Sequence, residues 1–278
     1  MIQPRQSKTK TISDGFTLTE LLVAIAIIGI LASLLLTALS SAKSYSRSAA
    51  CVNNLRQMGV ALKMYVEEHQ SRFPYYLGPE GPSYGDDVGI AGRALGLVYW
   101  SSKLFPYFPL NWTNAHFQCP GYAGITTGPT NSPAPVERRG SYGYNIWGSR
   151  VQDPPLASYG IGPIVFWKDT QGVPIPAVTE SEVVAPSEML SIGDSAWIKG
   201  TLPGSGLGVG VEPGGDDILV CNPNSWAYIY DQRHGEDYNQ LRCDGHVSRM
   251  RPQRIFTPSN SAAFWNYDHQ PHPEGWTF

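Results

Sequence analysis

An apolar run near the start of the chain constrains its fold more than any other feature. Residues 16–39 read FTLTELLVAIAIIGILASLLLTAL, and Glu20 is the only charged residue among these 24. As a helix with a rise of ~1.5 Å per residue, the run would be roughly 36 Å long, enough to cross a hydrocarbon layer of about 30 Å. The run therefore predicts a membrane-spanning helix.

The charges in front of the run predict its orientation. Residues 1–15 carry Arg5, Lys8 and Lys10 against Asp14, a net charge of +2. Because cations before a span favour a cytoplasmic N-terminus, we expect everything after the span to be exported. An ordinary secretory signal has an apolar region of about 7–15 residues with small residues behind it. Here the run is longer, and a glycine lies in front of it.

The junction at this glycine resembles a known processing site. Gly15-Phe16-Thr17-Leu18-Thr19-Glu20, with a basic leader before it and the apolar run after it, is similar to the cleavage site of type IV prepilins and type II secretion pseudopilins. The resemblance implies that prepilin peptidase cuts after Gly15 and that the new amino terminus at Phe16 is methylated. It also implies an assembly role for Glu20, the fifth residue of the mature chain.

Glu20 has a physical need for a partner. A carboxylate in the membrane costs about 2.5–3.5 kcal/mol on insertion scales. In a filament of side-by-side helices, the α-amine of Phe16 in a neighbouring subunit could offset this charge. The alternative is a carboxylate that snorkels to the membrane interface.

The helix is expected to continue beyond the membrane. Apolar or small residues recur every three or four positions, at Ala42, Tyr45, Ala49, Val52, Leu55, Met58, Leu62 and Tyr65. This spacing predicts one helix from Phe16 to about His69, closed by Phe73-Pro74, whose second half at 40–72 offers an amphipathic stripe to a domain.

The rest of the chain differs in composition. No proline occurs between Pro4 and Pro74, and 22 of the 23 prolines lie at or after Pro74. Beyond Pro74 the aromatics and turn formers are frequent, which predicts a β-rich, loop-rich exported domain at 73–278 and an α+β, pilin-like fold overall. A net charge of −3 with 15% charged residues argues against nucleic-acid binding and against a highly charged disordered chain.

Short alternating segments mark the expected strands of this domain. They are Glu188–Ile192, Trp226–Tyr230, Asn239–Cys243 and His246–Met250. Asp244-Gly245, between the last two, predicts a two-residue hairpin turn of type I′, in which both central residues have positive φ.

The C-terminal region extends the resemblance to prepilin-like proteins. His234, nine further residues and then Asp244-Gly245 are similar to the closing motif of a subgroup of this family. Four other segments also resemble that subgroup: Cys51–Gly59, Phe117–Pro120, Ser141–Asn145 and Pro186–Asp194.

Two roles are open for this motif. His234 could hold the hairpin by a hydrogen bond to Asp244 or to a nearby carbonyl. The second is a calcium site, because major pseudopilins carry calcium in a C-terminal loop and calcium needs 6–8 oxygen ligands. Its candidate ligands are Asp231, Glu236, Asp237 and Asp244. No other cofactor is expected.

The cysteines and histidines suggest little else. Cys51, Cys119, Cys221 and Cys243 would face an oxidising compartment and allow three full pairings. A Cys51–Cys119 disulfide would staple the domain to its helix, and an unpaired apolar role for Cys51 stays open. Zinc is disfavoured because the six histidines form no H-E-x-x-H pattern and the cysteines no C-x-x-C pattern.

A hydrolase is also disfavoured. Ser195, His234 and Asp194 or Asp244 can be written as a triad, but the serine is not in a G-x-S-x-G turn. We therefore expect no enzymatic activity.

These features predict a structural subunit of a type IV pilus or type II secretion pseudopilus in the bacterial inner membrane. Its expected partners are prepilin peptidase, other pilin or pseudopilin subunits, the assembly machinery and the membrane. One alternative is a membrane-anchored surface protein that never polymerises and binds glycans through its aromatic residues. Another is a secreted enzyme released by signal peptidase near 38–40.

Overall fold

A computed structural model gives the fold of the chain. It describes residues 16–78, 98–108, 118–122, 141–146, 148, 159–163, 175–195, 197–198, 214–215, 218–219, 228–229 and 233–273. The chain divides into two compact units, Met1–Lys43 and Ser44–Phe278. Gly15, Asp231 and Cys221 lie outside the described residues.

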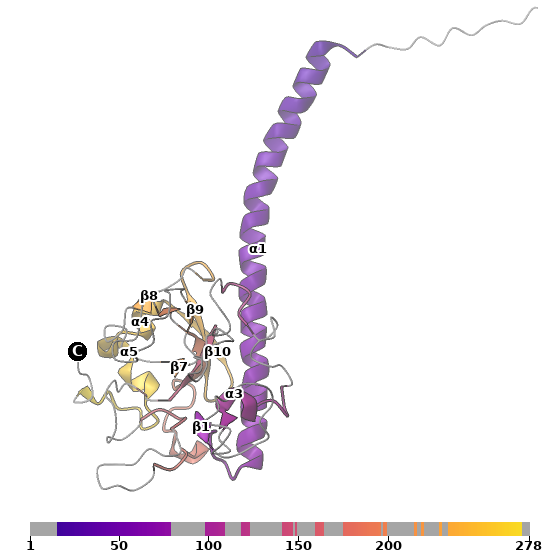
Figure 1. Cartoon of the computed structure of the whole chain (residues 1–278). Coiled ribbons are helices and arrows are strands. Elements are labelled where there is room, and N and C mark those ends of the chain that lie inside the picture. The colour runs from indigo at the N-terminus through magenta and orange to yellow at the C-terminus, as the bar shows by residue number, and fades with distance from the viewer. Residues whose placement is uncertain are drawn as a thin grey trace, which may run out of the picture. The chain divides into compact units, whose positions relative to one another are not determined.

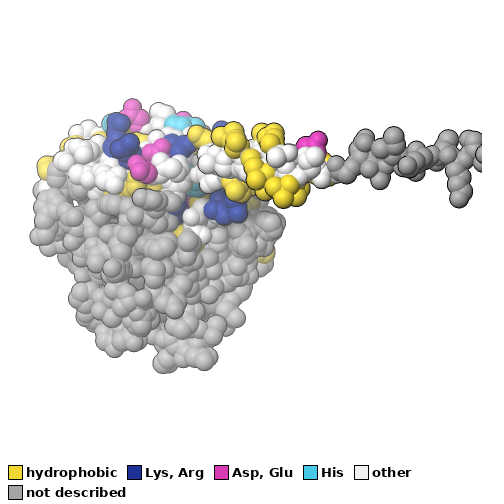
Figure 2. All heavy atoms as spheres, turned by 90° about the horizontal axis from the view of Figure 1, so that it is seen from above, with side chains coloured by type: hydrophobic (Ala, Val, Ile, Leu, Met, Phe, Trp, Pro, Cys, Tyr) yellow, Lys and Arg dark blue, Asp and Glu magenta, His cyan; other side chains and the backbone are white. Residues whose placement is uncertain are grey.

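The first helix, α1, runs from Leu18 to Glu68 as one continuous element of 51 residues (Figure 1). The predicted helix from Phe16 to about His69 is thereby confirmed to within two residues at each end. Figure 2 shows hydrophobic side chains covering its N-terminal part, where residues such as Ile28 and Leu35 are more than half exposed. Among the described residues, α1 is the one helix whose length and composition would let it cross a membrane.

A capping box begins α1. The Thr17 N–H and hydroxyl donate to Glu20 Oε2 at 2.9 and 2.7 Å, and the Glu20 N–H donates to Thr17 Oγ1 at 3.2 Å. Two backbone donors at the helix start are satisfied in this way, and the carboxylate lies at the positive end of the helix dipole. Within a single chain, Glu20 thus already has a partner.

The end of α1 differs from the prediction. Gln70 and Ser71 adopt left-handed backbone angles (φ 57° and 59°), and the Ser71 N–H donates to the Val66 carbonyl at 2.9 Å. This is the hydrogen bond of a Schellman cap, which turns the chain out of the helix. Because this cap already closes α1 at Glu68, Phe73-Pro74 plays no part in ending it.

A five-stranded sheet forms the centre of the second unit. Its strands are β3 (Tyr142–Asn145), β4 (Leu190–Asp194), β7 (Ile218–Leu219), β9 (Tyr238–Arg242) and β10 (Val247–Met250). The order is β10-β9-β4-β3-β7, and all neighbours are antiparallel except β3 and β7. The predicted strands at 188–192, 239–243 and 246–250 are confirmed with shifts of up to two residues, whereas β3 was not predicted.

Smaller elements complete the second unit. β1 (Leu77–Gly78) pairs with β2 (Val98–Tyr99), and β5 (Trp197–Ile198) lies between β6 (Gly214–Gly215) and β8 (Tyr228–Ile229). The predicted strand at 226–230 is described only as β8. The short helices are α3 (Trp100–Lys103), α4 (Pro252–Ile255) and α5 (Pro258–Trp265), with a 3₁₀ turn η1 at Glu180–Glu182.

The β9–β10 hairpin exists as predicted, but its turn type is different. Arg242 and His246 close the hairpin through an Arg242 N–H to His246 carbonyl bond of 2.8 Å, and the Gly245 N–H donates to the Arg242 carbonyl at 3.0 Å. The loop is therefore three residues long, and of these only Gly245 has positive φ, at 94°. A type I turn followed by one left-handed residue satisfies the strand twist as a type I′ turn would.

Two apolar clusters cover the two faces of the sheet. On one face, Leu55, Met58 and Leu62 of α1 belong to the same core as Ile192 and Leu241. The other cluster is formed by Leu190, Tyr238, Ile255, Phe256 and Trp265, so that α4 and α5 lie opposite α1. The second half of α1 is thus part of the domain core, as the amphipathic pattern predicts.

The start of the predicted stripe is wrong by one position. Tyr45 and Ala49 are exposed, whereas Ser48 and Cys51 are buried. Counting back from Leu55 by four and then three residues reaches Cys51 and Ser48, which hydrophobicity alone does not mark. Gly59 of α1 packs tightly against the sheet, because an added Cβ there would lie only 2.9 Å from Leu241 Cδ1.

Candidate functional site

A β-bulge brings an acidic side chain under α1. The β4–β9 register shifts between Leu190 and Ile192, so these two residues pack in opposite clusters although they are two positions apart. Asp194 lies two residues after Ile192 and therefore shares its face, toward α1. Tyr142 is the register partner of Asp194 on β3. Asp194 is fully buried, although it ends a strand.

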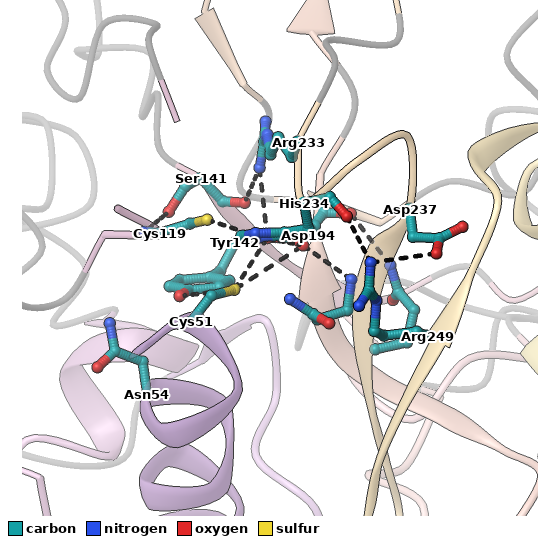
Figure 3. Close-up of polar contacts among 12 residues, drawn as sticks. Cys51, Asn54, Cys119, Ser141, Tyr142, Asp194, Arg233, His234, Asp237 and Arg249 are labelled. Carbon is teal, nitrogen blue, oxygen red and sulfur yellow. Dashed lines mark hydrogen bonds and ion pairs between the residues drawn. The ribbon is translucent and has the colours of Figure 1, made fainter. Parts of the chain in front are cut away.

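A left-handed turn before β9 supplies a histidine. His234, Gly235 and Glu236 all have positive φ, at 49°, 73° and 81°. Arg249 of β10 holds the turn, since its guanidinium donates to the His234 carbonyl and lies 3.2 Å from the Asp237 carboxylate. The turn brings the His234 side chain beside Cys119 and Asp194 (Figure 3).

The segment 118–122 supplies a cysteine. The Cys119 N–H donates to Ser141 Oγ at 2.6 Å, and the Ser141 N–H and hydroxyl donate to Gln118 Oε1 at 2.7 and 2.8 Å. Asn54 of α1 donates to the Gln118 carbonyl at 3.2 Å. These bonds fix Cys119 between the start of β3 and α1.

Four side chains from four segments converge at this point. One ligand atom each of Cys51, Cys119, Asp194 and His234 lies within 4.8 Å of all the others. Cys51 Sγ is 3.5 Å from Asp194 Oδ1, and His234 Nε2 is 3.1 Å from Cys119 Sγ and 3.4 Å from Asp194 Oδ2 (Figure 3). All four residues are buried, with at most 7% exposure. We call this group the four-residue cluster.

Further polar groups surround the cluster and satisfy its charges. Arg233 Nη1 lies 3.4 Å from Asp194 Oδ1, and its guanidinium donates to the carbonyls of Ser141 and Ser195 at 2.9 Å each. The Asn239 N–H donates to Asp194 Oδ2 at 2.8 Å. A buried carboxylate is tolerated only with such partners, because each uncompensated buried ion costs several kcal/mol.

The electrostatic environment separates the two cysteines. Burial raises the pKa of the Cys51 thiol well above its usual range, and the hydrogen bond with Cys119 adds to this. Burial also raises the pKa of Cys119, but the hydrogen bonds of Cys51 and His234, with Arg233 nearby, outweigh it and lower the pKa to about 7.

The pKa of His234 moves in the opposite direction. Burial lowers it, but contacts with Asp194 and Cys119 raise it to about 9. Because the pKa of Cys119 is about 7 and that of Cys51 lies well above its usual range, Cys119 is the cysteine that gives up its proton more readily.

The geometry is not that of a catalytic triad. In a triad the nucleophile and the carboxylate bind opposite nitrogens of the imidazole. Here Cys119 and Asp194 both contact His234 Nε2, and Nδ1 is buried without a hydrogen-bond partner. Ser195 was a candidate nucleophile from the sequence, and its backbone carbonyl accepts a hydrogen bond from the Arg233 guanidinium. The arrangement resembles a set of ligands more than a proton relay.

The predicted bond between His234 and Asp244 is wrong. The His234 ring faces Cys119 and Asp194, while Asp244 Oδ1 accepts the His246 N–H at 3.0 Å and lies 2.7 Å from His246 Nδ1. The turn before β9 carries the His234 ring into the interior, away from the β9–β10 loop. Asp244 and Gly245 instead line an open pocket of about 300 Å³ together with residues that include Lys63 and Glu180.

The predicted calcium ligands are distributed differently. Asp237 is paired with Arg249, and Asp244 with His246. Neither these two nor Glu236 belongs to a converging group of three or more ligand side chains in the described part of the chain. Cys51, Cys119 and Cys243 are thiols in the structure, and the first two lie side by side in the four-residue cluster.

At the other end of the chain, Phe16 is exposed and Glu20 forms the capping box at the start of α1. The fold, a long N-terminal helix whose second half packs on an antiparallel sheet, together with an exposed apolar first half, defines a pilin-like α+β protein. Comparison with known sequences supports this class.

Two family models match the chain. The prokaryotic N-terminal methylation motif covers residues 12–36, and a protein family of unknown function, DUF1559, covers residues 40–135. The chain is therefore a prepilin-like protein, and its motif implies processing by prepilin peptidase. The motif and the apolar helix together indicate membrane anchoring with an exported C-terminal domain. Neither the curated proteins nor the solved structures gave a match.

Proposed function

We propose that this protein is a structural subunit of a type IV pilus or a type II secretion pseudopilus, cut after Gly15 and held in the bacterial inner membrane until assembly. One observation carries the proposal. The most apolar window of α1 has no residue buried within the chain, although it forms a regular helix. Such a surface is stable only against lipid or against other apolar helices.

Assembly would exchange one apolar environment for the other. In the membrane, lipid covers the large side chains between Leu18 and Leu39, and in a filament the same helices of neighbouring subunits replace the lipid. Burial is retained in both states, so packing between helices and polar contacts decide the balance.

Glu20 supplies one such polar contact. In the single chain its carboxylate accepts two hydrogen bonds from Thr17. Cleavage after Gly15 would create a charged amine on Phe16, next to Thr17. The amine of one subunit and the Glu20 carboxylate of the next would then form a charge pair in a medium of low dielectric constant, where such a pair is strong.

The remaining roles follow from this one. The exported domain would decorate the filament, and no reaction is assigned to it. The partners would be prepilin peptidase, sister pilin-like chains and an assembly system driven by an ATPase. A lone membrane anchor with a surface-binding domain is the alternative, and it needs the same apolar helix but no contact between copies.

Cross-linking between copies distinguishes the filament subunit from the lone anchor. Leu31→Cys places a thiol on the exposed apolar part of α1, and the full chain would be oxidised in cells that contain its own assembly system. We expect disulfide-linked dimers that co-purify with sheared filaments. Glu20→Gln should abolish this cross-link while cleavage continues, whereas Glu67→Gln, a carboxylate in the second half of the same helix, should leave it unchanged. Filaments without this chain, or cross-linking that ignores Glu20→Gln, would contradict the proposal.

A further inference from the structure

The four-residue cluster has no part in the assembly mechanism above. It is nevertheless the most concentrated set of reactive side chains in the described residues, and it is buried in the exported unit. We propose that Cys51, Cys119, Asp194 and His234 bind one Zn²⁺ ion.

The donor types fit zinc. Structural zinc sites use four ligands drawn from cysteine thiolate, histidine nitrogen and carboxylate oxygen, in tetrahedral geometry. The cluster offers two sulfurs, one nitrogen and one oxygen. Sulfur ligands argue against calcium and magnesium, which prefer oxygen.

The distances also fit. With Zn–S near 2.3 Å and Zn–N or Zn–O near 2.0–2.1 Å, a tetrahedron separates sulfur from oxygen by about 3.5 Å and nitrogen from oxygen by about 3.3 Å. Measured to one oxygen, Asp194 Oδ2, the separations are 3.4 Å from His234 Nε2 and 3.9 Å from Cys51 Sγ, so the second would shorten by a few tenths of an ångström. The Cys119 Sγ to His234 Nε2 distance of 3.1 Å would lengthen by a few tenths of an ångström.

The charges balance around a dication. Two thiolates and the Asp194 carboxylate carry −3, while Zn²⁺ and the buried Arg233 guanidinium carry +3, with His234 neutral. Binding would displace the protons held by the Cys51 and Cys119 thiols and by His234 Nε2, because zinc ligands must be deprotonated. The His234 nitrogen that points into the cluster is Nε2, whose lone pair would bind the ion.

The surrounding hydrogen bonds would orient the ligands. The Tyr142 hydroxyl donates to Cys51 Sγ at 3.3 Å, and the Asn239 N–H donates to Asp194 Oδ2 at 2.8 Å. Ligand side chains of metal sites are held by outer contacts of this kind. The site is closed, because four protein ligands are present and all are buried, which is typical of a structural ion rather than a catalytic one.

Such an ion would fasten the exported half of α1 to its domain. Its ligands come from α1, from the segment 118–122, from the end of β4 and from the turn before β9. These segments are distant in the sequence. The competing fate of the same thiols is a Cys51–Cys119 disulfide, which would leave too few ligands for the ion.

Metal analysis of the full chain, purified in detergent without chelators, tests the proposal. We expect about one zinc ion per chain, measured by inductively coupled plasma mass spectrometry. Cys51→Ser, Asp194→Asn and His234→Asn should each lower this content severalfold, and asparagine is chosen at 234 because it tolerates the left-handed backbone there. The control is Cys243→Ser, a thiol outside the cluster, which should keep its zinc.

A second measurement needs no variant to fold. Exchange of the bound ion for Co²⁺ should give the visible absorption of a tetrahedral cobalt–thiolate site, and peptide mapping under non-reducing conditions should find Cys51 and Cys119 as thiols. A metal-free protein, a mapped Cys51–Cys119 disulfide, or zinc retained in the Cys51→Ser and His234→Asn variants would overturn the proposal. None of these results depends on whether the protein forms filaments.

Discussion

Truncation of Leu55 to alanine should greatly destabilise the exported unit. Leu55 lies in the second half of α1, is fully buried, and belongs to the core that α1 shares with the sheet. The substitution loses the transfer free energy of the removed methyl and methylene groups and leaves a cavity in the core. Together these two effects lower the free energy of unfolding by about 2.7–5 kcal/mol in comparable cores. For a domain of this size each kcal/mol lowers Tm by roughly 2–4 °C. The expected decrease in Tm is therefore about 5–20 °C.

The assay is unfolding of the detergent-solubilised full chain, followed by circular dichroism and tryptophan fluorescence. Val60→Ala is the matched control, because Val60 lies on the same helix but is 62% exposed, and it should change the stability by less than about 0.5 kcal/mol. If the two variants lost similar stability, or if Leu55→Ala cost under 1 kcal/mol, the argument that α1 is part of the domain core would be wrong.

Three further perturbations test separate parts of the structure. Burial raises the pKa of Tyr144 well above its usual value near 10. The stability that comes from the protonated Tyr144 hydroxyl is therefore complete below about pH 10 and is lost as the pH rises beyond it. Tyr144→Phe should reduce the slope of the free energy of unfolding against pH between about pH 9 and 11. Gly245→Ala should cost about 1–3 kcal/mol in denaturant unfolding, because an added Cβ meets open space but the φ of 94° is unfavourable for alanine. Thr17→Ala removes the capping box and should cost about 1 kcal/mol, seen as faster amide hydrogen exchange in the first turn of α1 with no change in the Tm of the exported unit; slower or equal exchange would contradict the cap.

The sequence was sufficient to predict the elements that are determined by residues close together in the chain. The helix from Leu18 to Glu68 and the β9–β10 hairpin were predicted because apolar periodicity and a turn-forming Asp-Gly pair act over a few residues. The end of the helix was not predicted correctly. Gln70 adopts the left-handed backbone conformation that ends the helix, and this position is usually occupied by glycine. The T-x-x-E pattern of Thr17 and Glu20 was a readable signal for the capping box.

The four-residue cluster could not be predicted from spacing. Its members lie in four separate segments, whereas recognised zinc motifs place two ligands within a few residues of each other. Asp194 points toward α1 because of a bulge in β4. Cys51 faces Asp194 because the buried residues at the start of the stripe on α1 lie one position away from those that hydrophobicity predicts. One signal was present: several of the segments that resemble prepilin-like proteins each contain one member of the cluster.

The mass of the mature protein from its native cells tests the central claim most directly. Cleavage after Gly15 with retention of the apolar helix predicts a chain that begins with N-methylated Phe16 and continues to its C-terminus. An unprocessed leader, or a mature chain that begins beyond Leu39, would contradict the account.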